Sequence, residues 1–269
     1  MSRRVSVPAV AFAALWLAAA CLDISSPVTG IAAISPIIAP TPSVVVGDSL
    51  RDTAGVVQPL RVHAFGPNGD TVRDARVVFL AIDTTRKLRV DSLTGLARGD
   101  SLAPNAQVVA RVMPASGSGA LQTPAVALPV VPVPQSMTKE SDVTLFEFTP
   151  SSDTLAASLQ SPALSVKVQG GTSAVPRYIV SFEIVERPPS PSGAPSVVLV
   201  NDNGRESVVD TTDASGLASR RLRVRPSAVD ADVLLGTRTV TARVRATAKY
   251  RGVPVPSPVE FTVQLRGKP

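Results

Sequence analysis

The chain has 269 residues, enough for one or two domains with hydrophobic cores at roughly 150 residues per domain. Hydrophobic residues make up 44% and charged residues 18% of it, with 25 Pro and a net charge of +6, which excludes a disordered chain and a bundle of membrane helices. One Cys and one His exclude a disulfide framework, a zinc site built from several Cys or His, and a thiol redox pair. We therefore expect no metal site and no cofactor.

The N-terminal segment has the pattern of a secretion signal. Arg3 and Arg4 precede an uncharged run over residues 5–20, which is shorter than the about 20 apolar residues of a membrane-spanning helix. The sequence thus predicts a signal peptide over residues 1–20. The only Cys, Cys21, follows Leu-Ala-Ala-Ala, and this arrangement resembles the lipobox of bacterial lipoproteins.

The lipoprotein resemblance implies that Cys21 receives a diacylglyceryl group and becomes the acylated first residue of the mature protein, held on the membrane by its lipid chains. The alternative is ordinary signal cleavage near a lone Cys. Leu22 stands where an Asp favours inner-membrane retention, so the expected location is the cell envelope, with the anchor in the outer membrane. Residues 21–42 are rich in Pro and Ser without helical or strand periodicity, which predicts an extended tether.

Beyond the tether, apolar and polar residues alternate with period two in short segments separated by turn residues, including Gly-Ser turns at 115–119. This pattern predicts an all-β fold of sandwich or barrel type. The expected strands are residues 60–65, 76–82, 107–113, 163–168, 178–185, 196–200, 220–225, 237–246 and 259–265.

The two halves of this region match in order, which indicates a duplicated domain. Leu60 aligns with Leu164, Phe79 with Phe182, and Leu-Thr-Gly-Leu-Ala at 93–97 with Ala-Ser-Gly-Leu-Ala at 214–218. Gly95 and Gly216 are expected at positive φ in a turn, with the preceding Asp bonded to its own backbone. The predicted core aromatic residues are Phe65, Phe79, Phe182 and Phe261.

Two motifs make this pattern similar to a known family. Residues 67–79, Pro-Asn-Gly-Asp-Thr-Val-Arg-Asp-Ala-Arg-Val-Val-Phe, are followed by Asp-Ser-Leu-Thr-Gly-Leu-Ala at 91–97, and Thr-Asp-Ala-Ser-Gly-Leu-Ala occupies 212–218. They resemble the bacterial Ig-like domains of the invasin and intimin type, although Asp74 replaces the usual Gly and 174–178 is a degenerate copy. The resemblance implies two tandem Ig-like antiparallel β-sandwiches, over 43–133 and 143–269, joined by a linker at 134–142. Such motifs specify fold and not activity.

Candidate catalytic groups are few. Gly-Asp-Ser-Leu occurs at 47–50 and 99–102, and its first copy resembles the nucleophile motif of lipolytic hydrolases. A nucleophilic Ser49 needs a base, and the only His, His63, lies on a predicted strand and is interpreted as a surface or half-buried residue. We expect turn chemistry here and no enzyme. The carboxylates Asp202, Glu206, Asp210 and Asp213 lack the spacing of a calcium loop and are also interpreted as turn residues.

Basic residues gather late in the chain, with nine basic and two acidic residues between 219 and 251. Period two places five arginines opposite apolar neighbours: Arg221, Arg223, Arg225, Arg243 and Arg245. They form either a solvated face that discourages edge pairing or an arginine-rich sheet face that binds a polyanion. Interleaved aromatic residues are missing, so nucleic acid is not an expected partner.

The sequence therefore predicts a lipid-anchored cell-envelope protein whose tandem Ig-like domains act as a non-catalytic structural spacer or binding module. The alternative is a surface adhesion or recognition module that binds a polyanionic glycan or lipid head groups through the arginine-rich face. The expected partners are the membrane, through the lipid anchor, and a polysaccharide, lipopolysaccharide or protein ligand.

Overall fold

The structure is a computed structural model that describes residues 30–82, 85–113 and 120–268. The predicted signal peptide, Cys21, the first part of the tether and the Gly-Ser turn at 115–119 lie outside these described residues. Within them, no helix is both long and apolar enough to cross a membrane.

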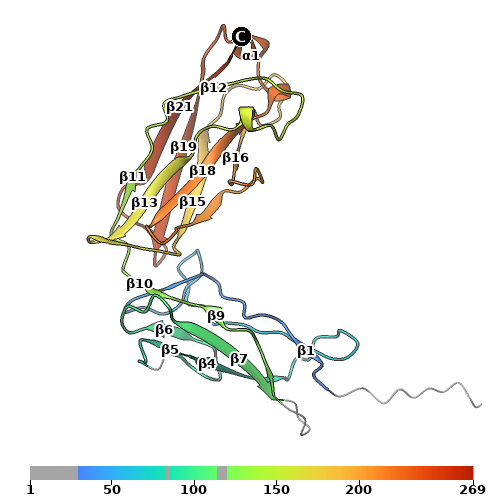
Figure 1. Ribbon diagram of the computed structural model, residues 1–269, viewed down its shortest axis with the longest axis vertical. Helices are drawn as coiled ribbons and strands as arrows, with labels where there is room; N and C mark the ends of the chain where they lie inside the picture. Colours follow the sequence, from blue (N-terminus) through green and yellow to red (C-terminus); the bar gives the residue numbers. More distant parts are fainter. Residues whose placement is uncertain (1–29, 83–84, 114–119, 269) are drawn as a thin grey trace, which may run out of the picture.

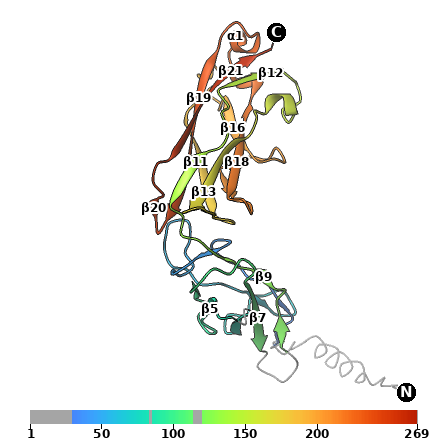
Figure 2. The same cartoon turned by 60° about the vertical axis from the view of Figure 1, so that its left-hand side comes forward.

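Almost all of the regular secondary structure in the described chain is β-strand, and the chain forms two sandwiches placed end to end (Figures 1 and 2). The all-β prediction is confirmed. The strands of the first sandwich are β1 (Ala33–Ile34), β2 (Val44–Val45), β3 (Ala64–Phe65), β4 (Arg76–Ala81), β5 (Leu88–Val90), β6 (Ala97–Gly99), β7 (Gln107–Met113), β8 (Leu121–Gln122), β9 (Val126–Ala127) and β10 (Val130–Val131).

The second sandwich carries the longer strands and three short helical turns. Its strands are β11 (Ser136–Lys139), β12 (Leu145–Phe148), β13 (Leu164–Gly170), β14 (Ser173–Ala174), β15 (Ile179–Glu186), β16 (Val197–Val200), β17 (Val209–Thr211), β18 (Leu217–Val224), β19 (Val240–Tyr250), β20 (Val253–Pro254) and β21 (Val259–Gly267). The helical turns are η1 (Ala157–Leu159), η2 (Pro226–Ala228) and α1 (Ala231–Leu234).

The strand order of the second sandwich is Ig-like. One sheet runs β11-β13-β18-β16, and the other runs β12-β21-β19-β15-β17. With β11, β13, β15, β16, β18, β19 and β21 read as A, B, C, D, E, F and G, these sheets are the A-B-E-D and G-F-C sheets of Ig domains. Because no disulfide joins the sheets, apolar packing between them holds the sandwich together.

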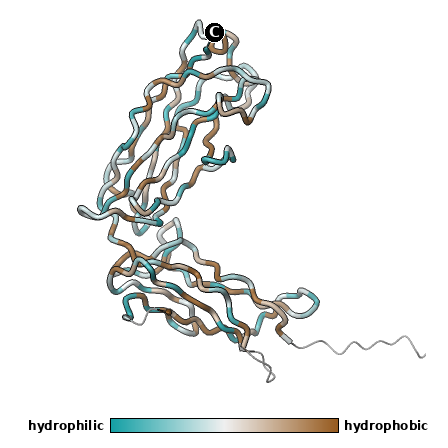
Figure 3. Tube along the Cα trace, viewed as in Figure 1, coloured by the Kyte–Doolittle hydropathy of each residue, from teal (hydrophilic) through white to brown (hydrophobic). Residues whose placement is uncertain are grey.

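Period-two alternation places one face of each sheet in that core. Along β19 every second residue from Val240 to Ala248 is buried, while the residues between them are partly exposed. In Figure 3, hydrophobic stretches run along the strands, whereas several of the turns are hydrophilic. Of the four predicted core aromatics, Phe79, Phe182 and Phe261 are buried, but Phe65 is only half-buried in the edge pair of β1 and β3. Sequence reasoning missed a buried pair on β12, Phe146 and Phe148.

The first sandwich is smaller and more irregular, but it repeats features of the second. The strand β2 pairs in parallel with β10, just as β12 pairs in parallel with β21. Phe79 on β4 lies opposite Ala110 on β7, and Phe182 on β15 lies opposite Ala246 on β19. A separate core of apolar residues, including Leu50, Leu60 and Phe79, fills the first sandwich.

The repeated glycine turns have the predicted chemistry. Gly95 and Gly216 have φ of 73° and 81°. The carboxylates before them, Asp91 and Asp213, each accept a hydrogen bond from the backbone amide two residues later. The Leu60 amide donates to the Gly95 carbonyl at 2.9 Å, and in the second domain the amide that donates to Gly216, also at 2.9 Å, belongs to Val168. The equivalent of Leu60 is therefore Val168 and not Leu164.

The expected tether and linker both contain parts of the sandwiches. Within 21–42, β1 pairs with β3, and Ile37 is buried in the first core. Within 134–142, β11 forms antiparallel pairs with β13, so residues 136–139 are an edge strand of the second domain. These segments have little alternation because edge strands have few buried side chains; sheet hydrogen bonds define them instead.

Candidate functional site: the interdomain junction

The five arginines of the expected polyanion face do not share a face. Arg221 and Arg223 lie on β18 in one sheet, with Arg225 just after it, whereas Arg243 and Arg245 lie on β19 in the other sheet. Leu222 and Val224 on β18, and Val244 and Ala246 on β19, point into the shared core. The arginines that alternate with them therefore project from opposite outer faces of the sandwich, and the prediction of one arginine-rich face is wrong.

Each of these arginines is also paired with a carboxylate. Arg223 and Arg225 share Glu206 at 3.0 and 2.6 Å, and Arg221 lies 3.5 Å from Asp202. On the other sheet, Arg243 and Arg245 share Glu260 at 2.7 and 2.9 Å. Glu186 also lies 3.7 Å from Arg243, so four carboxylates compensate most of the positive charge of the five arginines.

Arg220 was not singled out from the sequence, yet it is buried on β18. Its side chain is 8% exposed, and its Nη1 lies 3.0 Å from the Asp210 carboxylate. Asp202, Glu206 and Asp210 thus act as ion-pair partners, and Asp213 closes a turn. Within the described ranges, no group of three or more His, Cys, Asp or Glu is placed to hold a metal ion.

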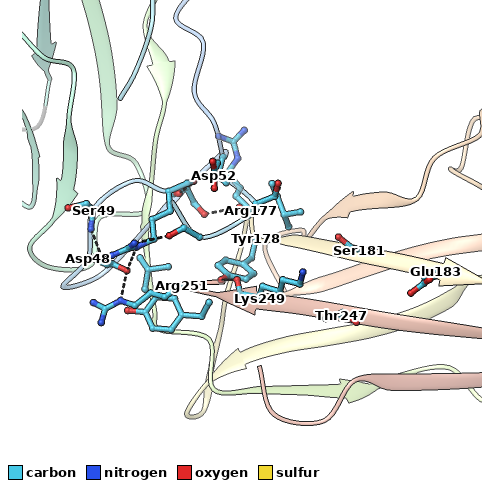
Figure 4. A pocket seen from close by; sticks show the side chains of 18 residues that line it. Asp48, Ser49, Asp52, Arg177, Tyr178, Ser181, Glu183, Thr247, Lys249 and Arg251 are labelled. Atoms are coloured by element: carbon cyan, nitrogen blue, oxygen red, sulfur yellow. Dashed lines mark hydrogen bonds and ion pairs between the residues drawn. The ribbon is translucent and has the colours of Figure 1, made fainter. Parts of the chain in front are cut away.

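The first Gly-Asp-Ser-Leu segment lies at the junction of the two domains (Figure 4). Gly47 has φ of 75°, and this left-handed turn directs Asp48 toward the second sandwich. Gly47 and Gly99, which begin the two copies of the motif, lie side by side: the Gly47 amide donates to the Gly99 carbonyl at 2.7 Å. In this contact the first copy contributes the backbone of a turn, and the second copy contributes the backbone at the end of strand β6.

Asp48 joins the two domains. Its side chain is 5% exposed and accepts hydrogen bonds from Arg51 Nε and Nη2 at 3.0 Å each. Arg251, in the turn after β19 of the second domain, donates from Nε to the same carboxylate at 2.8 Å. Burial alone raises the pKa of Asp48, but the hydrogen bonds from Arg51, Arg251 and the Ser49 amide outweigh burial and lower the pKa to about 2. Asp48 is therefore ionised throughout the physiological pH range.

Two glycines allow the domain backbones to touch beside this carboxylate. Gly55 and Gly252 have φ of +87° and +79°, and a Cβ on Gly55 would lie 2.2 Å from the Gly252 nitrogen. A Cβ on Gly252 would lie 2.8 Å from the Ala54 carbonyl oxygen. Only glycine combines this backbone conformation with so close an approach.

Further contacts extend the junction on both sides of Asp48. The Ser43 hydroxyl donates to the Arg177 carbonyl of the second domain at 2.8 Å. Val45 and Val131 of the first domain belong to the apolar core of the second. Ion pairs, backbone contact and shared apolar burial thus all connect the two sandwiches at this junction.

A cavity of about 320 Å³ lies beside this junction, between the turn at 48–55 and the outer face of β15 and β19. Figure 4 shows Ser181, Glu183 and Thr247 along these strands, with Lys249 nearer the junction. The chain's only two tyrosines, Tyr178 and Tyr250, both line it. The Tyr178 hydroxyl donates to the Lys249 carbonyl at 2.5 Å, and burial raises the pKa of Tyr178, so the phenol stays protonated.

Ser49 also lines this cavity, but His63 does not. His63 is exposed near the β1–β3 pair, where its backbone carbonyl accepts from the Ser35 amide at 2.8 Å. Among the described residues that line the cavity there is no histidine to activate Ser49. The first Gly-Asp-Ser-Leu segment instead has a structural role at the junction. Gly47 forms the turn, and Asp48 forms the ion pairs.

Comparisons with solved structures return adhesins and cadherins. The adhesin InvE of Yersinia pseudotuberculosis is 16% identical over 86% of this chain and 57% of that chain, with a TM-score of 0.36. The D0-D1 domain of intimin is 16% identical over 88% and 99% of the two chains, with a TM-score of 0.28. Mouse protocadherin-24 EC1-3 is 12% identical over 86% and 67%, with a TM-score of 0.27.

The chain thus spans little more than half of the InvE chain. No family model and no curated protein matches the sequence. The assignment of the fold therefore rests on the strand order observed in the structure.

Sequence reasoning missed the junction because its parts are far apart in the chain. One signal was present: the second domain ends a long alternating strand with Tyr-Arg-Gly at 250–252, a turn that carries a charge and a glycine together. Nothing in the sequence indicates that this turn meets Gly-Asp-Ser-Leu.

Proposed function

We propose that the protein is a lipid-anchored component of the cell envelope, in which two Ig-like sandwiches form a stiff, non-catalytic spacer and binding module. The stiff spacer is supported by the junction, where Asp48 of the first domain is bonded to Arg251 of the second. The anchor is supported by the lipobox-like sequence that ends at Cys21. The C-terminus lies at the end of the second sandwich away from the junction (Figures 1 and 2). A stiff junction therefore holds the second sandwich in a fixed position relative to the first.

The anchor is tested by intact mass measurement of the protein purified from its own membranes, beside a Cys21→Ser variant. The expected mass is that of residues 21–269 plus a diacylglyceryl group and a further acyl chain, and the variant leaves the membrane fraction. An unlipidated product in the soluble fraction would overturn the anchor.

The stiff spacer is tested by the distance between spin labels on cysteines introduced at Leu93 and Leu235, one in each domain, in the Cys21→Ser background. Both side chains are well exposed, at 67% and 64%, so the labels should leave the cores unchanged. One narrow distance distribution is expected, and Asp48→Asn should broaden it. A broad distribution in the parent protein contradicts the spacer.

The polyanion-binding alternative through Arg221, Arg223, Arg225, Arg243 and Arg245 has no support from the geometry, because these residues are split between two faces and paired with carboxylates. Its test is retention on a heparin column. Retention that falls steeply with salt, and is lost when Arg221, Arg223, Arg243 and Arg245 are changed to Ser, would restore it.

A further inference from the structure

The cavity at the junction has properties of a ligand site that the spacer role does not require. Its volume of about 320 Å³ lies at the lower end of the range of small-molecule sites, and such sites occur preferentially at domain interfaces. Apolar surface from Val45, Ile179 and the two tyrosines adjoins hydroxyl and charged groups. Such a mixed lining suits a ligand with both apolar and polar faces.

Two cations that line the cavity have no carboxylate partner among the described residues, unlike the arginines around β18 and β19. Arg177 makes one long hydrogen bond from its guanidinium, 3.4 Å to the Ala127 carbonyl. No ion pair joins Arg177 or Lys249 to a carboxylate of the described chain within 4.0 Å. The cavity therefore offers two positively charged donors to an incoming anion.

The backbone at Arg177 has an uncommon conformation. Its φ of 53° lies in the left-handed region, where most residues other than glycine are strained. Arg251 lies in the same region with φ of 52°, and its side chain is accounted for by the ion pair to Asp48. Arg86 and Ser257 share this conformation, so the backbone at Arg177 indicates only that glycine is compatible with position 177.

The remaining polar groups favour a sugar over a small inorganic anion. Ser181, Thr247 and Glu183 occupy neighbouring positions on the outer face of β15 and β19, where they can exchange hydrogen bonds with ligand hydroxyls. Glu183 and Asp52 also line the cavity and oppose a compact, highly charged ion such as phosphate. One carboxylate on a polyhydroxylated ring meets both requirements.

We infer that this cavity binds an acidic sugar residue, with its carboxylate held by Arg177 and Lys249 and its hydroxyls by Ser181, Thr247 and Glu183. This inference deepens the binding-module part of the proposed function and moves the anionic-glycan site from the arginine strands to the junction. The site is built from both domains, so the stiff junction also fixes its shape.

The test is calorimetric titration of the full-length protein in detergent with a glucuronate-containing disaccharide and with its carboxyl-reduced, neutral counterpart. Binding of the acidic disaccharide alone is expected. Arg177→Gly, which relieves the backbone strain, and Lys249→Ala should each weaken binding about tenfold or more, as expected for a lost hydrogen bond to a charged group. The matched control is Arg187→Ser, which removes an exposed cation outside the cavity and should leave affinity unchanged.

Three results would overturn the inference: no binding of the acidic disaccharide, equal binding of the neutral one, or equal losses in Arg187→Ser and the cavity variants. The last result indicates general electrostatic attraction. Each leaves the anchor and spacer unaffected, because those are measured by mass and by label distances. The glycine variant keeps the test valid, since it is expected to fold at least as well as the parent.

Discussion

Asp48→Asn is the most informative single change in the junction. It keeps the size of the side chain but removes the negative charge that faces Arg51 and Arg251. The shift in the pKa of Asp48 from 3.8 to about 2 corresponds to about 2.5 kcal/mol, at about 1.4 kcal/mol per unit. Removing one partner of a fully buried ion pair costs about 3–5 kcal/mol, but Arg251 is 52% exposed, so we expect a loss of about 2 kcal/mol.

This stabilisation depends on pH in a defined direction. The folded-state pKa is lower than the unfolded value, so ionised Asp48 stabilises the fold above about pH 4, and this contribution disappears as the pH falls toward 2. The difference between the parent and Asp48→Asn should therefore be constant near neutral pH and shrink between pH 4 and 2.

Urea unfolding followed by tyrosine fluorescence is a suitable assay, because both tyrosines of the chain line the junction cavity. Circular dichroism follows the sheets of both domains in parallel, which matters because two domains need not unfold in one step. The matched control is Asp100→Asn in the second Gly-Asp-Ser-Leu segment. Its partners Arg89 and Arg98 are 70% and 64% exposed, so the expected loss is below about 1 kcal/mol.

Coupling between the domains is measured by a double-mutant cycle of Asp48→Asn with Arg251→Gln. A coupling of about 1 kcal/mol or more is expected at neutral pH. Additive effects of the two changes, or an Asp48→Asn loss no larger than that of Asp100→Asn, would refute the interpretation of Asp48 as the residue that joins the domains.

Three further changes test the packing. Gly216→Ala should destabilise the second domain by more than about 2 kcal/mol in urea unfolding, because φ is +81° and the new Cβ would lie 2.6 Å from the Val168 carbonyl oxygen. The matched control is Gly193→Ala, which has φ of +73° but open space around it and should cost only about 1 kcal/mol. Equal losses would contradict the close-approach argument. Phe261→Ala, at a side chain that is 0% exposed, should cost about 3–5 kcal/mol in the same assay, and a loss below 1 kcal/mol would show that the core is packed differently. Gly252→Ala should broaden the label distances between Leu93 and Leu235, because its Cβ would lie 2.8 Å from Ala54; an unchanged distribution would argue against backbone contact at the junction.

Local patterns in the sequence were sufficient for the strands of the sandwich core. The segments around Phe79, Phe182 and Phe261 alternate clearly because one face of each strand is buried and the other is exposed. The turns at Gly95 and Gly216 were predictable for the same local reason, since positive φ and an Asp bonded to nearby amides involve only a few adjacent residues. The edge strands β1 and β11 were missed because partners elsewhere in the chain define them, whereas β12 was missed although its buried Phe146 and Phe148 alternate with Glu147.

The sequence by itself thus determined the all-β class and the positions of the main strands and glycine turns. Tertiary structure alone decided which strands share a sheet, and so placed the arginines of β18 and β19 on opposite faces and beside carboxylates. It also brought Asp48 to Arg251, 203 positions away, and created the cavity beside them. The physical reason is distance along the chain: alternation and turn preferences act over a few residues, whereas ion pairs and cavities depend on where the packed sheets place residues.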